Sequence, residues 1–199
     1  MGKSEVRNKI GILGGTFDPV HIGHLILADT ARQALGLNKV LFIPALKPPH
    51  KNSLQLTSAS LRTQMLEQAI AANPFFSFSK IEIEKKGISY SVETLWDLKK
   101  IHPRTNFYFI AGSDVLPKLN TWKQIDKIFR LCKFVIAVRP SFTQCSFYKK
   151  LYKKLIFLQG IYPDISSSLI RRLVRSNKSI MYLVPSSVSQ FINQHSLYK

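Results

Sequence analysis

Cysteine, acidic residues and long apolar runs are all scarce in this 199-residue chain. Its two cysteines, Cys132 and Cys145, are too few for the disulfide framework of a small secreted domain. We therefore expect free thiols in a reducing, cytoplasmic setting. The apolar stretches are short and interrupted by glycine or charged residues, so we expect neither a signal peptide nor a membrane-spanning helix.

The shortage of acidic residues leaves the chain strongly basic. Twenty-nine lysines and arginines face 11 aspartates and glutamates, and the formal net charge is +18. Such an excess favours polyanionic partners, which include nucleic acid, anionic membranes and phosphate-bearing small molecules. A generally basic composition without a specific partner is the alternative. The 45% hydrophobic content suits a single globular domain spanning residues 1–199, as a monomer or a homodimer.

Short apolar runs alternate with helical patterns along the chain. Buried strands are predicted at residues 10–13, 40–43, 107–110 and 134–138, and a half-buried strand near an edge at residues 76–83. Helices are predicted between these runs, one of them capped by Thr57 or Ser58, with two more near residues 167–175 and 186–194. The alternation indicates an α/β fold. We expect a Rossmann-like, doubly wound parallel sheet with flanking helices and a small C-terminal helical part.

The first predicted strand leads directly into a candidate phosphate site. Gly14 and Gly15 follow the strand, and a helix begins near Ile22. Close backbone approach and a helix N-terminus both favour an anion there. His21 and His24 stand three residues apart and supply imidazole donors that can stabilise charge during phosphoryl transfer. A plain turn with surface histidines and a pair of metal ligands are the alternatives. We predict no metal site, because no third ligand stands nearby in the sequence.

A second cluster of hydroxyls precedes the helix predicted near residue 167. The hydroxyls of residues 166–168 can cap this helix and donate to phosphate, with Ser167 and Ser168 assigned to the phosphates. Arg171, one turn later, can neutralise a leaving pyrophosphate. A serine-capped surface helix is the alternative. Arg172 faces elsewhere on the helix and is assigned no role.

These two segments carry a family resemblance. Residues 14–24, Gly-Gly-Thr-Phe-Asp-Pro-Val-His-Ile-Gly-His, resemble the GxFDPxHxGH signature of bacterial nicotinate-mononucleotide adenylyltransferases, which belong to the HxGH nucleotidyltransferase superfamily. Residues 165–171 resemble the family's ISSTxIR motif, with Ser168 in place of threonine. Class I aminoacyl-tRNA synthetases share the His-Ile-Gly-His sequence, but they are far longer and carry tRNA-binding domains.

The resemblance implies adenylyl transfer from ATP to nicotinate mononucleotide, with Mg²⁺ carried on the ATP phosphates. It makes His21, His24 and Arg171 the catalytic candidates. The residues it implies around ATP are Gly14, Gly15, Thr16, Phe17, Gly23, Asp114, Ser167 and Ser168.

The middle of the chain contains the candidates for the acceptor site. Residues 87–95 resemble the family's GxSYTxDTL segment, with Ser91 for threonine and Glu93 for aspartate. Arg139, in a segment that departs from the family's RPG, is considered only as a nucleotide-side contact. The residues that the resemblance places around the pyridine mononucleotide are His50, Lys51, Tyr90, Ser91 and Trp122.

Two alternatives stay open from the sequence. Nicotinamide mononucleotide or another phosphorylated acceptor can replace the nicotinate compound, because acid and amide differ by one group. A basic nucleic-acid-binding protein without activity is the alternative from a different class, motivated by the net charge. Under the enzyme hypothesis we expect neither an obligate nucleic-acid partner nor a membrane partner.

Overall fold

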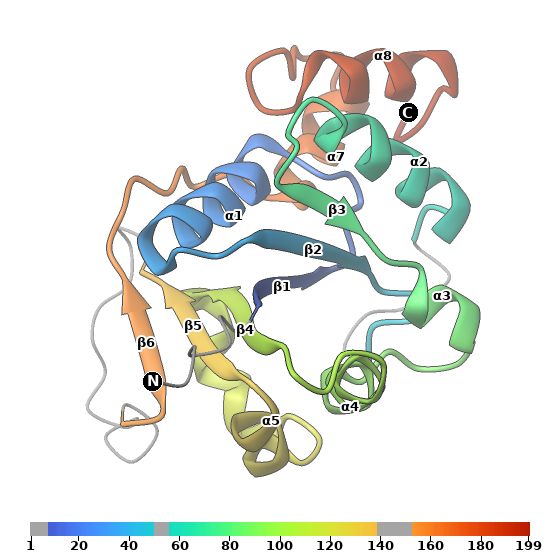
Figure 1. Ribbon diagram of the computed structural model, residues 1–199. Coiled ribbons are helices and arrows are strands. Elements are labelled where there is room, and N and C mark those ends of the chain that lie inside the picture. Colours follow the sequence, from blue (N-terminus) through green and yellow to red (C-terminus); the bar gives the residue numbers. More distant parts are fainter. Residues whose placement is uncertain (1–7, 50–55, 139–152) are drawn as a thin grey trace, which may run out of the picture.

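A computed structural model describes residues 8–49, 56–138 and 153–199 (Figure 1). Within these ranges six strands form one sheet, in which every neighbouring pair is parallel. The strand order is β3-β2-β1-β4-β5-β6, so the predicted doubly wound parallel sheet is confirmed. The strands are β1 (Lys9–Gly15), β2 (Lys39–Pro44), β3 (Phe76–Phe78), β4 (Asn106–Gly112), β5 (Lys133–Ala137) and β6 (Leu155–Leu158).

Helices cover both faces of the sheet (Figure 1). On one face α1 (Ile22–Leu35), α2 (Ala59–Ile70), α7 (Ser167–Arg175) and α8 (Ser186–Gln194) enclose one hydrophobic cluster. On the other face α4 (Ser91–Ile101), the 3₁₀ segment η2 (Ser113–Thr121) and α5 (Ile125–Leu131) enclose a second cluster. The strands between them are buried on both sides, which explains their nearly continuous apolar runs. None of the described helices is both long and apolar enough to cross a membrane.

Two local predictions differ from the structure. The strand predicted over residues 76–83 is wrong after Phe78, because a short helix, α3 (Ile81–Lys85), follows β3. The Ser79 hydroxyl accepts the Ile81 N–H at 3.3 Å, and this local bond turns the chain into the helix. Strand β6 was not predicted, because its four residues are a short apolar run next to a stretch without a recognised motif. The predicted cap of α2 is confirmed at Ser58, whose hydroxyl accepts the Leu61 N–H at 3.4 Å.

The order of the strands determines where a ligand can bind. The chain leaves β1 toward β2 on one side, whereas β4 pairs with β1 on the other side. A crevice forms outside the carboxyl ends of the strands at such a reversal. The loop after β1 and the start of α1 lie at this point of the sheet.

Candidate active site

A cavity of about 650 Å³ lies where the strand order reverses. Three segments that are distant in the sequence line it: the loop after β1, the start of α4, and the chain that follows β4. The structure thereby brings together eight of the sixteen candidate residues, and His21, Phe17, Gly23, Ser167, Ser168 and Arg171 are not in its lining. Those lining the cavity are Gly14, Gly15, Thr16, His24, Tyr90, Ser91, Asp114 and Trp122.

The two histidines have different positions in this site. His24 lines the cavity, whereas His21 is only 3% exposed and lies behind it. Their rings stack with centroids 3.6 Å apart. The His21 backbone N–H donates to His24 Nδ1 at 3.2 Å, so a neutral His24 carries its ring proton on Nε2. His24 is therefore the imidazole that can present an N–H to a ligand, with His21 as its support.

Gly23 lies close to the His21 ring. A Cβ at this position would lie 3.1 Å from His21 Nδ1. The glycine is therefore required for packing of the His21 ring, and its place near ATP stays a prediction.

The Phe17 ring packs against the loop after β1 from the side of the hydrophobic core. This residue adopts a left-handed conformation, with φ of 50°, and its ring is 1% exposed. A Cβ at Gly15 would lie 2.9 Å from the Phe17 ring. Phe17, expected near ATP, packs in the core rather than lining the cavity, and Gly15 permits that packing.

The C-terminal motif is bonded to the same loop. Ser166 caps α7 by accepting the Leu169 N–H at 3.1 Å. The Ser167 hydroxyl donates to the Pro19 carbonyl at 2.9 Å, and Arg171 Nη1 donates to the Asp18 carbonyl at 2.7 Å. Arg171 Nη2 also donates to the Ser168 hydroxyl at 3.3 Å. The two sequence motifs thus form one structure, with the α7 side chains fastening the loop.

A buried polar cluster beneath this loop was missed by sequence reasoning. The Asp18 carboxylate, on a residue 2% exposed, accepts the Tyr198 hydroxyl at 2.7 Å and the Thr57 N–H at 3.4 Å. Burial raises the pKa of the Tyr198 phenol, so it remains a donor. The cluster connects Tyr198 to the loop after β1.

Arg62 completes this cluster from helix α2. It is 1% exposed and donates to three carbonyls: Thr16 at 2.6 Å, Thr57 at 2.9 Å and Leu46 at 3.3 Å. Burial lowers its pKa, and the nearby Asp18 charge opposes this effect. A signal was present in the sequence, because Arg62 stands one turn before Leu66 on the apolar face of α2.

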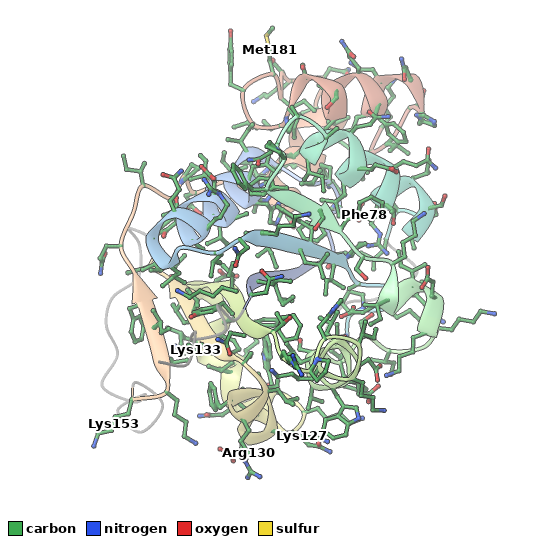
Figure 2. The ribbon with its side chains drawn as sticks, in the orientation of Figure 1. Phe78, Lys127, Arg130, Lys133, Lys153 and Met181 are labelled. Carbon is green, nitrogen blue, oxygen red and sulfur yellow. The ribbon has the colours of Figure 1, made fainter. Side chains whose placement is uncertain are left out.

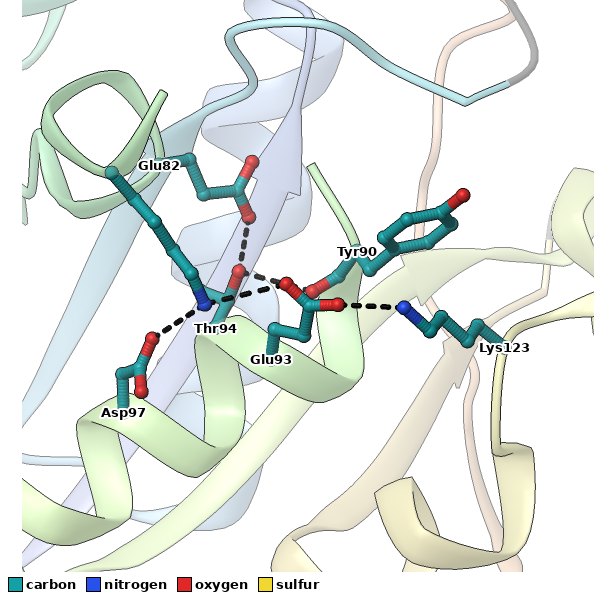
Figure 3. Close-up of polar contacts among 7 residues, drawn as sticks. Glu82, Tyr90, Glu93, Thr94, Asp97 and Lys123 are labelled. Carbon is teal, nitrogen blue, oxygen red and sulfur yellow. Dashed lines mark hydrogen bonds and ion pairs between the residues drawn. The ribbon is translucent and has the colours of Figure 1, made fainter. Parts of the chain in front are cut away.

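The acceptor segment at the start of α4 is held by hydroxyl contacts. The Ser89 hydroxyl accepts the Leu46 N–H at 3.0 Å, and the Thr94 hydroxyl donates to the Glu82 carboxylate at 2.6 Å (Figure 3). Glu82 also lines the cavity. Burial raises its pKa, and the Thr94 hydrogen bond partly opposes that shift. Sequence reasoning did not single out Glu82.

Trp122 both packs in the core and borders the cavity. Its ring makes edge contacts with Phe109 at 5.7 Å and Phe134 at 5.8 Å between centroids. These contacts hold the indole in one orientation beside Tyr90, which lines the same cavity. Asp114, in the first turn of η2, is exposed and also borders it.

The remaining candidates lie outside the described residues. His50, Lys51 and Arg139 fall in the ranges 50–55 and 139–152. Among the residues that the structure describes, no group of three or more histidine, cysteine, aspartate or glutamate side chains is placed to hold a metal ion.

Part of the basic charge gathers away from this cavity. Lys127, Arg130, Lys133 and Lys153 lie near α5 and the adjacent strands, far from Met181 at the other end of the molecule (Figure 2). Three of them, Arg130, Lys133 and Lys153, line a second cavity of about 470 Å³.

Comparisons with known proteins agree with this geometry. Residues 12–173 match the family model described as cytidylyltransferase-like. A Desulfitobacterium hafniense protein named "Probable nicotinate-nucleotide adenylyltransferase" is 40% identical over 198 residues, which cover 96% of each chain. A Clostridium botulinum protein of the same name is 42% identical over 196 residues, covering 94% of this chain and 98% of its own.

A solved structure has the same fold. The chain superimposes on Plasmodium falciparum nicotinic acid mononucleotide adenylyltransferase complexed with NaAD, with a TM-score of 0.83 and 21% identity. The match covers 96% of this chain and 98% of the other.

Proposed function

Because the chain belongs to the cytidylyltransferase-like family and, within it, to the nicotinate-nucleotide adenylyltransferases, we propose that it transfers the adenylyl group of ATP to nicotinate mononucleotide. The products are nicotinate adenine dinucleotide and pyrophosphate, in the biosynthesis of NAD. The observation that carries the proposal is that one cavity joins the phosphate loop at His24 to Tyr90 and Trp122. An enzyme that links two nucleotides needs both binding sites to open into the same space.

ATP occupies the side of the cavity formed by β1 and α1. An oxygen of the mononucleotide phosphate attacks the α-phosphorus of ATP, and the bond from that phosphorus to the bridging oxygen breaks, which releases pyrophosphate. Catalysis of this kind consists mainly of positioning and charge stabilisation. The Nε2–H group of His24 donates a hydrogen bond to the α-phosphate, and His21 supports the ring by stacking. Mg²⁺ enters with the phosphates of ATP and water as its ligands.

The distal phosphates lie toward α7 in this arrangement. Arg171 has five N–H donors, and its contacts with Asp18 and Ser168 use two of them. The others remain for the departing pyrophosphate. Asp114 accepts hydrogen bonds from ribose hydroxyls, as acidic residues at the carboxyl ends of such strands do.

The pyridine ring occupies the side formed by α4 and Trp122. The edge contacts of Trp122 with Phe109 and Phe134 keep one indole face available for stacking. The first backbone N–H groups of α4, at Ser91 and Val92, precede the first intrahelical bonds and lie at the positive end of the helix dipole. A carboxylate on the ring is stabilised there more than a neutral amide is.

A two-substrate assay tests this function. Purified protein is incubated with Mg·ATP and either nicotinate or nicotinamide mononucleotide, and dinucleotide and pyrophosphate are quantified. We expect both products in equal amounts, with the acid preferred. A clear preference for the amide would overturn the choice of acceptor, and no product from either compound would overturn the enzyme hypothesis.

Nucleic-acid binding is the second candidate, and the basic cavity near α5 is the observation that favours it. Arg130, Lys133, Lys153 and Lys154 line this cavity, with Asp126 as the acidic residue among its lining. Its test is the binding of a labelled single-stranded oligonucleotide at increasing salt. Tight, salt-dependent binding together with absent pyrophosphate release would favour this candidate over the enzyme. The cytoplasmic location and the choice between monomer and homodimer stay predictions.

A further inference from the structure

Lys123 is a charged residue that lines the active-site cavity, and the proposed function assigns no role to it. It directly follows Trp122, and among the described residues that line this cavity it is the only lysine or arginine. A cation in that position acts on whatever anionic group an acceptor brings to this side of the cavity.

Two contacts hold the Lys123 ammonium in place (Figure 3). Its Nζ lies 4.1 Å from the centroid of the Tyr90 ring, on the face of the ring, and 2.7 Å from Glu93 Oε1. A cation is attracted to the face of a tyrosine ring at this distance. The ammonium is thereby held against the start of α4, on the side of the cavity where the proposed function places the pyridine ring.

Glu93 forms ion pairs with two lysines, Lys123 and Lys85. Its other carboxylate oxygen, Oε2, lies 3.3 Å from Lys85 Nζ, and Lys85 also lies 2.9 Å from Asp97 Oδ2 (Figure 3). The hydrogen bond from Lys123, followed by that from Lys85, lowers the pKa of Glu93, so it is ionised at neutral pH. The four charges alternate in one row. Lys123 is the positive end of this row, it borders the cavity, and it shares its carboxylate partner with another lysine.

We propose that Lys123 is a specificity-determining residue that favours the carboxylate of a pyridine mononucleotide over the corresponding amide. This inference rests on the proposed function. Among the described residues Glu93 is the carboxylate that pairs with Lys123, so a substrate carboxylate supplies a second anionic partner, whereas an amide carries no charge to pair with the ammonium. The side chain of Lys123 is 44% exposed, which limits the strength of the contact.

The test compares the two acceptors in variants of the full-length enzyme. The measured quantity is kcat/KM for nicotinate and for nicotinamide mononucleotide at saturating Mg·ATP. In Lys123→Met we expect kcat/KM for the acid to fall about tenfold, as for loss of one charge-assisted hydrogen bond. The value for the amide should stay within about twofold, and it serves as an internal check that the variant is folded. Lys123→Arg should keep most of the preference for the acid.

Lys127→Met is the matched control. Lys127 also lies over an aromatic ring, with its Nζ 4.4 Å from the Trp96 centroid, but it does not line the active-site cavity. Its replacement should leave the acid-to-amide ratio unchanged.

Two results would overturn the role of Lys123. An equal loss for both acceptors in Lys123→Met would show that it acts on the phosphate that both compounds share, and an unchanged ratio would show that it does not act on the carboxylate. If the wild-type protein used neither mononucleotide, the proposed function would fail, and the role of Lys123 with it.

Discussion

The buried guanidinium of Arg62 offers the sharpest test of how the phosphate loop is held. Arg62→Met preserves most of the side-chain length and removes the donors of three hydrogen bonds to Thr16, Thr57 and Leu46. Each buried carbonyl that loses its donor costs about 1–3 kcal/mol, and the Asp18 carboxylate loses a compensating charge. The variant no longer has to desolvate a guanidinium, which offsets part of this loss.

The net effect should match the disruption of a buried ionic network, about 3–5 kcal/mol of unfolding free energy. For a chain of this length each kcal/mol lowers Tm by roughly 2–4 °C, so Tm should fall by about 6–20 °C. Urea unfolding and thermal unfolding both measure the effect. Arg172→Met is the control, because Arg172 is an exposed arginine on α7. The assigned network would be wrong if the loss of unfolding free energy in Arg62→Met exceeded the loss in Arg172→Met by less than about 1 kcal/mol.

Three further predictions concern the same region. His24→Ala should lower kcat by about 10²–10³-fold, because one donor to the transferred phosphate is lost; unchanged turnover would refute this role. Gly15→Ala should cost about 1–3 kcal/mol in urea unfolding, because its Cβ would lie 2.9 Å from the Phe17 ring, whereas Gly14→Ala should cost less, since its nearest contact would be 3.7 Å away. The pKa of Tyr198 is raised in the folded protein, so above about pH 10 the unfolded chain releases the phenol proton before the folded chain does. The unfolding free energy of the wild type should therefore fall with rising pH, by up to about 1.4 kcal/mol per pH unit. Tyr198→Phe lacks this proton and is the reference. Parallel slopes in urea titrations from pH 9 to 11 would contradict it.

The sequence predicts the fold because its signals are local. A buried parallel strand needs a short apolar run, and a helix needs a periodic apolar face, so the core strands β1, β2, β4 and β5 are recognisable from a few consecutive residues. The same reasoning is wrong for residues 79–83, where two isoleucines spaced two apart fit a strand although the segment forms the short helix α3. A signal of so few residues does not distinguish the two structures.

The candidate site was predictable in its parts but not in its assembly. Glycine, histidine and serine motifs identify the phosphate loop and the start of α7 without a structure. Their mutual bonding, from Arg171 to Asp18 and from Ser167 to Pro19, joins residues about 150 positions apart. No local pattern contains that information, because it depends on how α7 packs against the sheet.

What the sequence by itself determined is the alternation of strands and helices, the glycine-histidine and serine motifs, and the family resemblance that these motifs carry. Only the tertiary structure placed His21 behind His24, buried Arg62 beneath the loop, and ended a row of four charges with Lys123 at the cavity. The physical reason is that propensity and periodicity act between neighbours in the chain. Burial, stacking and charge pairing depend on which distant residues share the same space.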